Sequence, residues 1–424
     1  MLELLAKKLE TIDGARLPLM EGDSTVVWRL TSGNMLSALA FLGIFSVTFS
    51  IAVSQIFLGL AVLCWLYILW RHPSMVGRPI APLYLLAGFA VAAILSALMS
   101  PNPQYSLGYF RKFWLYSLLV IVPAAFRTTG RLERLYCWVA VGSAASALVA
   151  IFQYFFDPHI TLVNRITGLT GHWMTFSGLQ MLSLISTMSL LLSYRGREYR
   201  WVLPAVPLQI FSLVLCQTRS AWLGLVVGLL VLAFMISWRW VIGVGTASAL
   251  SFFLLPVHFQ SRLKAAFDLN DETTRIRLEL LQTGLNMIEA HPFFGVGLKM
   301  VPQEYVHYNT TNEFPFWIYQ HLHNDFIQIG AEVGLVGLAF WIAFLAVFVV
   351  HCIRIVARSD LSDPEKGAAR AAVSCVAALL VAGLFEYNFG DSEVLTLFLF
   401  LLAAPYAGKE FTAKARRLKN EGWV

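Results

Sequence analysis

The residues best suited to chemistry lie in and around one long polar interval, residues 257–324, of an otherwise hydrophobic chain. This interval ends with His321 and His323, and its middle carries Arg275 and Arg277. A histidine can take the proton of an attacking hydroxyl near neutral pH. An arginine stays charged and can bond a phosphate through two N–H groups at once. Together, these residue types favour a reaction in which a hydroxyl displaces a phosphorylated leaving group.

Further candidates come from other parts of the chain. Arg219 follows Gln217 and Thr218 between two hydrophobic runs, and Arg165 lies in a short polar stretch after another. Each of the four arginines also has a simpler interpretation, as an interfacial cation or as part of a solvated helix face. Both interpretations stay open at the level of sequence. Three polar residues are possible supporting groups: His172, His321 and Asn324.

A metal site is the alternative interpretation of the two histidines. His321, His323 and Asp325 alternate as ligands would on an extended strand. Asn324 followed by Asp325 is, however, typical of the beginning of a helix. We therefore predict no metal and no cofactor. A Ser-His-Asp triad stays open as well, although the chain has no G-x-S-x-G elbow.

The composition indicates a membrane protein. Hydrophobic residues make up 58% of the chain and charged residues 13%, whereas globular proteins carry roughly 25% charged residues. Apolar runs of about 18 residues or more are typical of transmembrane helices. We predict an all-α polytopic fold in which residues 1–424 form one transmembrane domain. The five cysteines lie in or beside apolar runs without C-x-x-C spacing, which is typical of packing residues.

Twelve hydrophobic segments are long enough for membrane spans, and the first two are the least clearly separated. They cover residues 35–50, 52–70, 80–99, 111–126, 134–156, 173–194, 201–217, 220–237, 239–256, 325–353, 368–387 and 392–407.

The distribution of basic residues predicts the orientation. With both tails, 1–34 and 408–424, in the cytoplasm, most of the 31 Lys and Arg fall on the cytoplasmic side, as the positive-inside rule requires. The polar interval 257–324 then lies outside. Most histidines, including His172, His321 and His323, fall on that outer side. The outer side keeps few basic residues: Arg111, Lys112, Arg165, Arg219, Arg262, Lys264, Arg275, Arg277 and Lys299.

The polar interval itself contains a predicted helix. Asp271 is a suitable N-cap, and His291 followed by Pro292 ends the pattern. An apolar stripe repeats at helical spacing, which predicts an amphipathic helix lying over the bundle with this stripe facing it. The stripe consists of Leu278, Leu281, Leu285 and Ile288.

An enzyme on the outer face must use substrates that are already activated, because no ATP pool exists there. The chain also has no P-loop and no dinucleotide-binding fingerprint. A sugar linked to a lipid diphosphate meets this requirement, because it resides in the membrane and has an anionic leaving group. The outer arginines suit binding of the diphosphate leaving group, and the outer histidines suit deprotonation of the attacking hydroxyl.

At these residues the chain resembles the O-antigen ligase and polymerase superfamily. The similar motifs occur in the family's order. They are Thr218-Arg219-Ser220-Ala221-Trp222, Arg277-Leu278-Glu279, His291-Pro292, Gly295-x-Gly297, His323-Asn324-Asp325 and Glu332-x-Gly334-x-x-Gly337, with a weaker upstream likeness at Arg165-x-x-Gly168. One departure is Leu281, where family members often carry an aromatic residue; it leaves the choice between Arg275 and Arg277 open.

The resemblance implies an inverting, metal-independent glycosyltransferase with the GT-C architecture in a bacterial inner membrane. It would transfer O-antigen polysaccharide from undecaprenyl diphosphate to the lipid A-core oligosaccharide on the periplasmic face. By this resemblance, His323 would assist the acceptor hydroxyl, while Arg219 and Arg277 would hold the donor diphosphate, with Arg165 and Arg275 as further candidates.

Three alternatives compete with a ligase. An O-antigen polymerase would lengthen the glycan, and a protein O-oligosaccharyltransferase would modify a serine, although such enzymes tend to have longer C-terminal regions. A lipid-linked glycan transporter would be expected to show repeated halves and charges deep in its spans. The predicted spans are nearly free of charge, which favours the enzyme.

Overall fold

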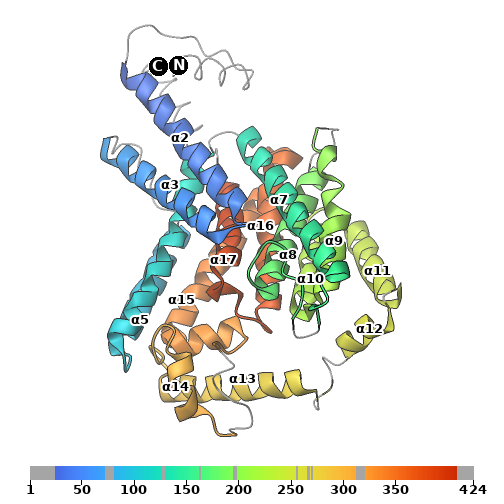
Figure 1. Cartoon of the computed structure of the whole chain (residues 1–424). Coiled ribbons are helices and arrows are strands. Elements are labelled where there is room, and N and C mark those ends of the chain that lie inside the picture. The colour runs from blue at the N-terminus through green and yellow to red at the C-terminus, as the bar shows by residue number, and fades with distance from the viewer. Residues whose placement is uncertain are drawn as a thin grey trace.

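The computed structural model describes residues 24–71, 81–126, 129–161, 164–193, 198–254, 256–264, 268, 271–311 and 320–407. Within these residues every regular element is helical, and most helices run side by side in one bundle (Figure 1). Most of the two predicted cytoplasmic tails, residues 1–23 and 408–424, lies outside the described residues, as do several basic turns that the predicted orientation uses.

The helices of the first half are long and mostly apolar. They are α2 (Ser24–Ser46), α3 (Ile51–Arg71), α4 (Ala81–Met99), α5 (Pro103–Tyr109), the 3-10 helix η2 (Phe110–Ser117), α6 (Leu118–Ala125), α7 (Thr129–Phe156) and α8 (Trp173–Ser193).

The second half holds the helices of the polar interval and those that follow it. They are η3 (Arg200–Val202), α9 (Ala205–Cys216), α10 (Arg219–Phe234), α11 (Trp238–Leu254), α12 (Val257–Lys264), α13 (Glu272–Ala290), α14 (Val301–Tyr308), α15 (Asp325–Val356), α16 (Asp363–Ala382), η6 (Asn388–Gly390), α17 (Ser392–Ala403) and η7 (Ala404–Tyr406).

The expectation of an all-α, multi-pass membrane protein is confirmed at this level. Each of the twelve predicted segments coincides with one helix or with two consecutive helices. Among the described residues, five helices are long and apolar enough to cross a membrane. These are α3, α4, α7, α8 and α15.

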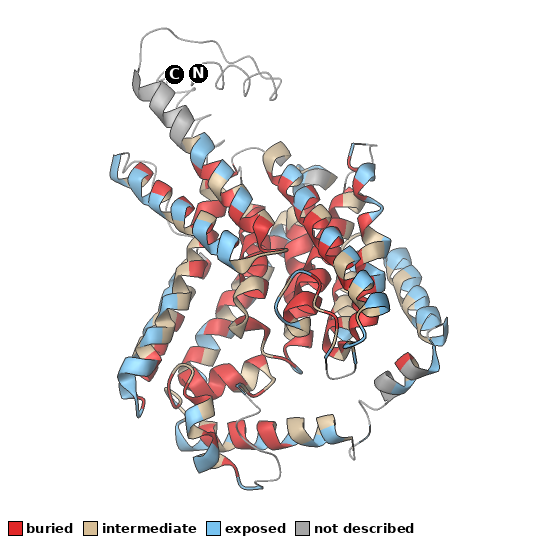
Figure 2. Cartoon of the chain, in the orientation of Figure 1, coloured by how far each residue is buried: buried red, intermediate tan, exposed pale blue. Residues whose placement is uncertain are grey.

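The core of the bundle lies around α8, which is almost entirely buried (Figure 2). Helix α10 packs closely on α16 because small residues line their contact. A Cβ atom on Gly224 would lie 2.7 Å from the carbonyl oxygen of Ala378, and one on Gly228 would lie 2.9 Å from the Cβ of Ala378. Small residues let membrane helices approach in this way without a hydrophobic driving force between them.

Helix α13 lies across one end of the bundle and is the longest helix among the described residues of the polar interval (Figure 1). The Asp271 side chain accepts a hydrogen bond from Thr274 N, and His291 is the C-cap, so both predicted ends are confirmed. The predicted stripe is wrong in part, because Leu278 is 49% exposed and Leu285 43% exposed. The buried face is instead offset around the helix and comprises Glu279, Leu280, Thr283, Gly284 and Met287. This face packs on α14 and α15.

Helix α15 is kinked at Gly334, which has a φ of 77°. A Cβ atom there would lie 2.2 Å from the carbonyl oxygen of Phe293. The loop after α13 forms hydrogen bonds with the backbone groups of α15 around the kink. Val296 N donates to Ala331 O at 2.8 Å, and Leu335 N donates to Pro292 O at 2.8 Å. Backbone irregularity inside a membrane protein requires such partners. The glycine motif therefore fixes the polar interval to α15.

Candidate active site

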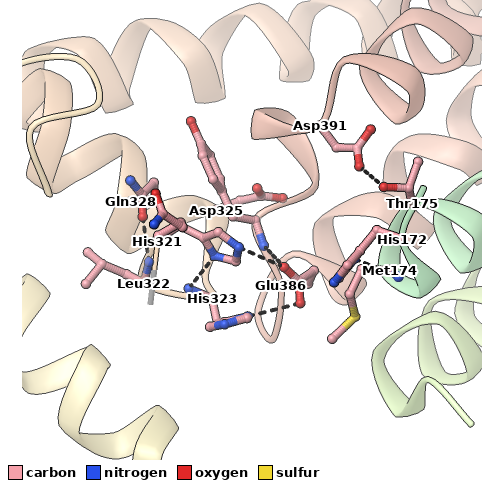
Figure 3. Close-up of polar contacts among 12 residues, drawn as sticks. His172, Met174, Thr175, His321, Leu322, His323, Asp325, Gln328, Glu386 and Asp391 are labelled. Carbon is pink, nitrogen blue, oxygen red and sulfur yellow. Dashed lines mark hydrogen bonds and ion pairs between the residues drawn. The ribbon is translucent and has the colours of Figure 1, made fainter. Parts of the chain in front are cut away.

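The centre of the site is a pair formed by His323 and Glu386, which come from two different loops. The Nδ1 atom of His323 lies 3.0 Å from Oε2 of Glu386 (Figure 3). Glu386 is only 5% exposed, whereas about a quarter of the His323 side chain, 23%, is exposed. The buried carboxylate thus contacts Nδ1 of His323, and part of the imidazole ring remains accessible to solvent.

His321 binds the other oxygen of the same carboxylate. Its Nε2 lies 3.6 Å from Oε1 of Glu386, and its Nδ1 accepts a hydrogen bond from the backbone N–H of His323 at 3.3 Å. Both ring nitrogens of His321 therefore face protein groups. With an ionised Glu386, Nδ1 of His323 must be the donor, so the lone pair of a neutral His323 lies on Nε2. This difference makes His323 the better candidate for a general base.

The pKa values follow from burial and from these contacts. Burial lowers the pKa of His321 to about 4, although the Glu386 charge opposes that shift, so the ring stays neutral near pH 7. Burial alone would raise the pKa of Glu386. The hydrogen bond from His323 and the neighbouring imidazoles outweigh burial and hold that pKa below its ordinary value. Glu386 therefore remains an acceptor.

The loop that carries Glu386 is fastened to the start of α15. Asn324 caps α15 by accepting from Phe326 N and Ile327 N, and its Nδ2 donates to Leu384 O at 3.0 Å. The backbone N–H of Asp325 donates to Gly383 O at 2.7 Å. The helix start that presents His323 therefore also fixes the chain around Glu386. Asn324 has a positioning role in this arrangement.

Three ligand atoms could hold a metal ion here. The donor nitrogens of His321 and His323 and a carboxylate oxygen of Glu386 all lie within 4.8 Å of one another. Asp325, which the sequence suggested as the third ligand, is instead fully buried, and its Oδ1 accepts from Phe389 N at 3.2 Å. Glu386 takes its place in the potential metal group.

A cavity of about 250 Å³ adjoins the pair. His321, Glu386 and His172 line it, and burial lowers the pKa of His172. The charges of Glu386, His323 and Arg165 also act on His172. The sequence suggested His172 as a possible supporting residue. In the structure it lines the same cavity as Glu386 and is affected by the charges of the central pair.

Arg165 and Arg219 come from two inter-helix turns. Arg165 Nη1 donates to Gln217 O at 3.3 Å, and its guanidinium lies 5.8 Å from the Trp173 ring centre. Arg219, whose side chain is 9% exposed, is the first residue of α10, and its Nη2 lies 3.9 Å from Oδ1 of Asp271. This ion pair connects α10 with the N-cap of α13.

The two arginines of α13 have different surroundings. Arg277 is half-buried, and its guanidinium lies 6.0 Å from the ring centre of Phe385, the neighbour of Glu386. Arg275 is exposed. The structure therefore places Arg277 nearer the central pair, which makes it the stronger candidate of the two.

Backbone strain concentrates at this site. Among the described residues, the non-glycine residues with positive φ are Gln217 (55°), Lys299 (58°) and His323 (49°). Gln217 binds Arg165, Lys299 lines the cavity, and His323 belongs to the central pair. Such conformations cost about 1–3 kcal/mol each and tend to persist at functional sites.

Glu386 was not predicted from the sequence, because it lies near the end of a segment predicted as a span. Helix α16 in fact ends at Ala382, and Glu386 occupies the loop before α17. The sequence does contain a feature that could have identified Glu386. An acidic residue at the outer end of a hydrophobic segment is energetically costly and is often functional.

Comparison with known protein families gives a match over part of the chain. Residues 204–342 match the family model described as O-antigen ligase. The matched stretch extends from α9 into α15 and includes Arg219, Arg277 and His323, whereas Arg165 and Glu386 lie outside it. None of the curated proteins matches the chain.

Proposed function

We propose that this chain, which belongs to the O-antigen ligase/polymerase superfamily, is an O-antigen ligase. It would transfer O-antigen polysaccharide from undecaprenyl diphosphate to the lipid A-core oligosaccharide, with inversion and without a metal. The observation that carries the proposal is the hydrogen bond between His323 and Glu386 at 3.0 Å, with Arg277 of the matched family segment beside Phe385, the neighbour of Glu386. It is the arrangement that a general base requires.

The proposed reaction is a single displacement. The acceptor hydroxyl attacks the anomeric carbon of the donor sugar and gives its proton to Nε2 of His323. The bond between that carbon and the diphosphate oxygen breaks from the opposite side, so the anomeric centre inverts. Glu386 stabilises the imidazolium, and undecaprenyl diphosphate leaves with the electron pair.

The arginines suit the leaving diphosphate. Arg277 lies beside Phe385, next in sequence to Glu386, and the Arg165 charge acts on His172 in the site. Arg219 would join them from α10, where Asp271 holds it. Guanidinium groups bind phosphate oxygens in pairs and keep their charge throughout the reaction.

The membrane arrangement is part of the proposal. All twelve hydrophobic segments would cross a bacterial inner membrane in a GT-C-type bundle, with both termini in the cytoplasm. The site would then face the periplasm. The agreement between the twelve segments and the helices supports this arrangement.

Lipopolysaccharide from a deletion strain tests the function. A ligase predicts bare lipid A-core together with polymer that accumulates on the carrier lipid. Core bearing a single repeat unit would indicate a polymerase instead, and unchanged lipopolysaccharide would contradict both. Addition of EDTA to the purified enzyme tests the metal-free step, because loss of transfer that zinc restores would assign His321, His323 and Glu386 to a metal.

A further inference from the structure

The cavity beside the catalytic pair is chemically distinct from the region of the arginines. None of the four candidate arginines lines it, nor do their partners Gln217, Asp271 and Phe385. Of the central pair only Glu386 lines the cavity, and His321, the other histidine at this carboxylate, lies beside it in the wall. If the arginines hold the donor, this space is left for the other substrate.

The walls of this cavity suit a sugar. Aromatic side chains from four parts of the chain line it, and aromatic faces pack against the apolar faces of sugar rings. Polar groups lie between the rings, as in most small-molecule sites. The aromatic residues are Phe89, Tyr109, Phe113, Tyr116, Trp341, Tyr387 and Phe389.

Two lysines, Lys112 and Lys299, also line the cavity, and their charges repel each other. Among the described residues neither ammonium has a carboxylate within ion-pair distance. Lys112 Nζ donates to Gly390 O at 2.8 Å, and Lys299 Nζ donates to Gln320 O at 3.2 Å. Each half-buried cation thus has a neutral carbonyl as its partner, an arrangement that an anion between them would stabilise.

The carboxylates of the cavity are already engaged elsewhere. Glu332 accepts from Gln328 Nε2 at 2.7 Å. Asp391 accepts from Thr175 and caps α17. Glu386 binds the two histidines. The charges of Glu332 and Asp391 act on Lys112, but neither carboxylate lies within ion-pair distance of a lysine ammonium, so both lysines can still bind a charged ligand directly.

The backbone of Lys299 adds an independent observation. Its φ of 58° is unfavourable for a lysine, since glycine and asparagine adopt this conformation more readily. A strained residue that could have been replaced by glycine suggests that the side chain itself is needed.

We propose that this cavity binds the acceptor sugar, and that Lys112 and Lys299 bind an anionic substituent of that acceptor, a phosphate or a carboxylate. The term acceptor rests on the proposed transfer reaction. The binding of an anionic sugar does not, because it follows from the aromatic walls and the two lysines.

The test measures binding to the purified full-length protein by calorimetry, with no donor present. The probes are glucose, glucose 6-phosphate, glucuronate and inorganic phosphate. In the unaltered protein at least one of the two anionic sugars should bind about 10-fold or more tightly than glucose, since a charge-assisted hydrogen bond contributes on that order. Inorganic phosphate should bind more weakly than the preferred anionic sugar, because it cannot pack on the rings.

Two variants remove the charges separately. Lys112→Gln and Lys299→Asn should each reduce the preference for the anionic sugar at least several-fold, and asparagine tolerates the left-handed backbone at 299. Lys366→Gln, in the first turns of α16, is the matched control and should keep the preference. Lys112→Arg and Lys299→Arg should retain it in part and show that the cavity is still folded.

Three results would overturn the proposal: equal binding of glucose and both anionic sugars, a preference that survives both charge removals, or inorganic phosphate binding as tightly as the anionic sugars. In transfer assays the same two variants should raise KM for the acceptor and leave KM for the donor unchanged. A raised donor KM would assign the cavity to the donor instead. Because the calorimetry needs no turnover, failure of the proposed transfer reaction would leave the binding result intact.

Discussion

Nδ1 of His323 and Oε2 of Glu386 lie 3.0 Å apart, although 63 residues separate them in the chain. An ionised carboxylate can accept a hydrogen bond only from a nitrogen that bears a proton. This contact therefore fixes the tautomer of His323 with the proton on Nδ1. A base that is oriented by a buried carboxylate is a recurrent device for activating a hydroxyl. The pair therefore explains why the chain brings the loop after α16 against the start of α15.

Removal of the Glu386 charge should slow the chemical step. Glu386→Gln keeps the shape of the side chain but can no longer stabilise an imidazolium or fix the tautomer. We expect kcat for transfer to fall on the order of 10²–10⁴-fold while both KM values change little. Steady-state kinetics with purified protein in detergent measure this split.

A second carboxylate–histidine contact provides the control. On α14 the Nδ1 atom of His307 lies 3.2 Å from Oε2 of Glu304, and the His307 side chain is exposed. Glu304→Gln should leave kcat unchanged. Equal losses in the two variants would mean that Glu386 acts only through stability.

The two arginines of α13 should differ in their effect on the donor. Arg277→Ala should raise KM for the lipid-linked donor about 10-fold or more, because a charge-assisted contact to the diphosphate is lost. Arg275→Ala should have the smaller effect, since Arg275 is exposed. Donor titrations at saturating acceptor measure both values, with Arg358→Ala beyond the far end of α15 as the control. A larger effect from Arg275 would reverse the assignment.

The kink of α15 should tolerate only glycine. Gly334→Ala places a Cβ atom 2.2 Å from Phe293 O at a φ of 77°, so we expect a destabilisation of at least about 1–3 kcal/mol and loss of activity. Thermal unfolding in detergent measures the change. Gly243→Ala on α11 is the matched control, because a Cβ there meets nothing within 4 Å and should be neutral or stabilising. An unfolding temperature for Gly334→Ala equal to that of the unaltered protein would contradict the steric account.

His321 should make stability depend on pH in a defined window. Its pKa in the folded protein is about 4, below the ordinary 6.5, so the unfolded chain binds a proton that the folded chain does not. Stability should therefore fall as pH decreases from 6.5 to 4, by up to about 3 kcal/mol, and His321 should contribute no further loss below pH 4. Glu386 contributes its loss at lower pH, because its pKa is depressed.

The contribution of His321 to stability is isolated by comparing the unaltered protein with His321→Asn. The unfolding temperatures of both are measured across this pH range. The variant should show a shallower decline between pH 6.5 and 4. Parallel curves would mean that His321 is not buried in its neutral form.

The sequence was sufficient for the parts of this fold that depend on local patterns. The helix caps at Asp271 and Asn324 were predicted because capping chemistry acts over three or four residues. Apolar runs located the helices of the bundle for the same reason. The buried face of α13 was not predicted, because its neighbours α14 and α15, not hydrophobicity alone, decide which side packs.

Long-range contacts explain the remaining differences. Glu386 meets His323 where Asp325 and Asn324 hydrogen-bond to the loop at residues 383 and 384, and no local spacing encodes that arrangement. The glycines of the family motif could be recognised in the sequence, but the structural reason why glycine is needed there could not. Gly334 is required because the loop after α13 passes directly over it.

The rate of glycan transfer by His323→Ala tests the central claim most directly. Purified protein, lipid-linked donor and lipid A-core acceptor are combined without nucleotide, and product is followed by gel shift. We predict that transfer falls to background, by roughly 10³-fold or more, while membrane insertion and unfolding temperature stay close to those of the unaltered protein. Near-normal transfer by a correctly folded His323→Ala protein would contradict it.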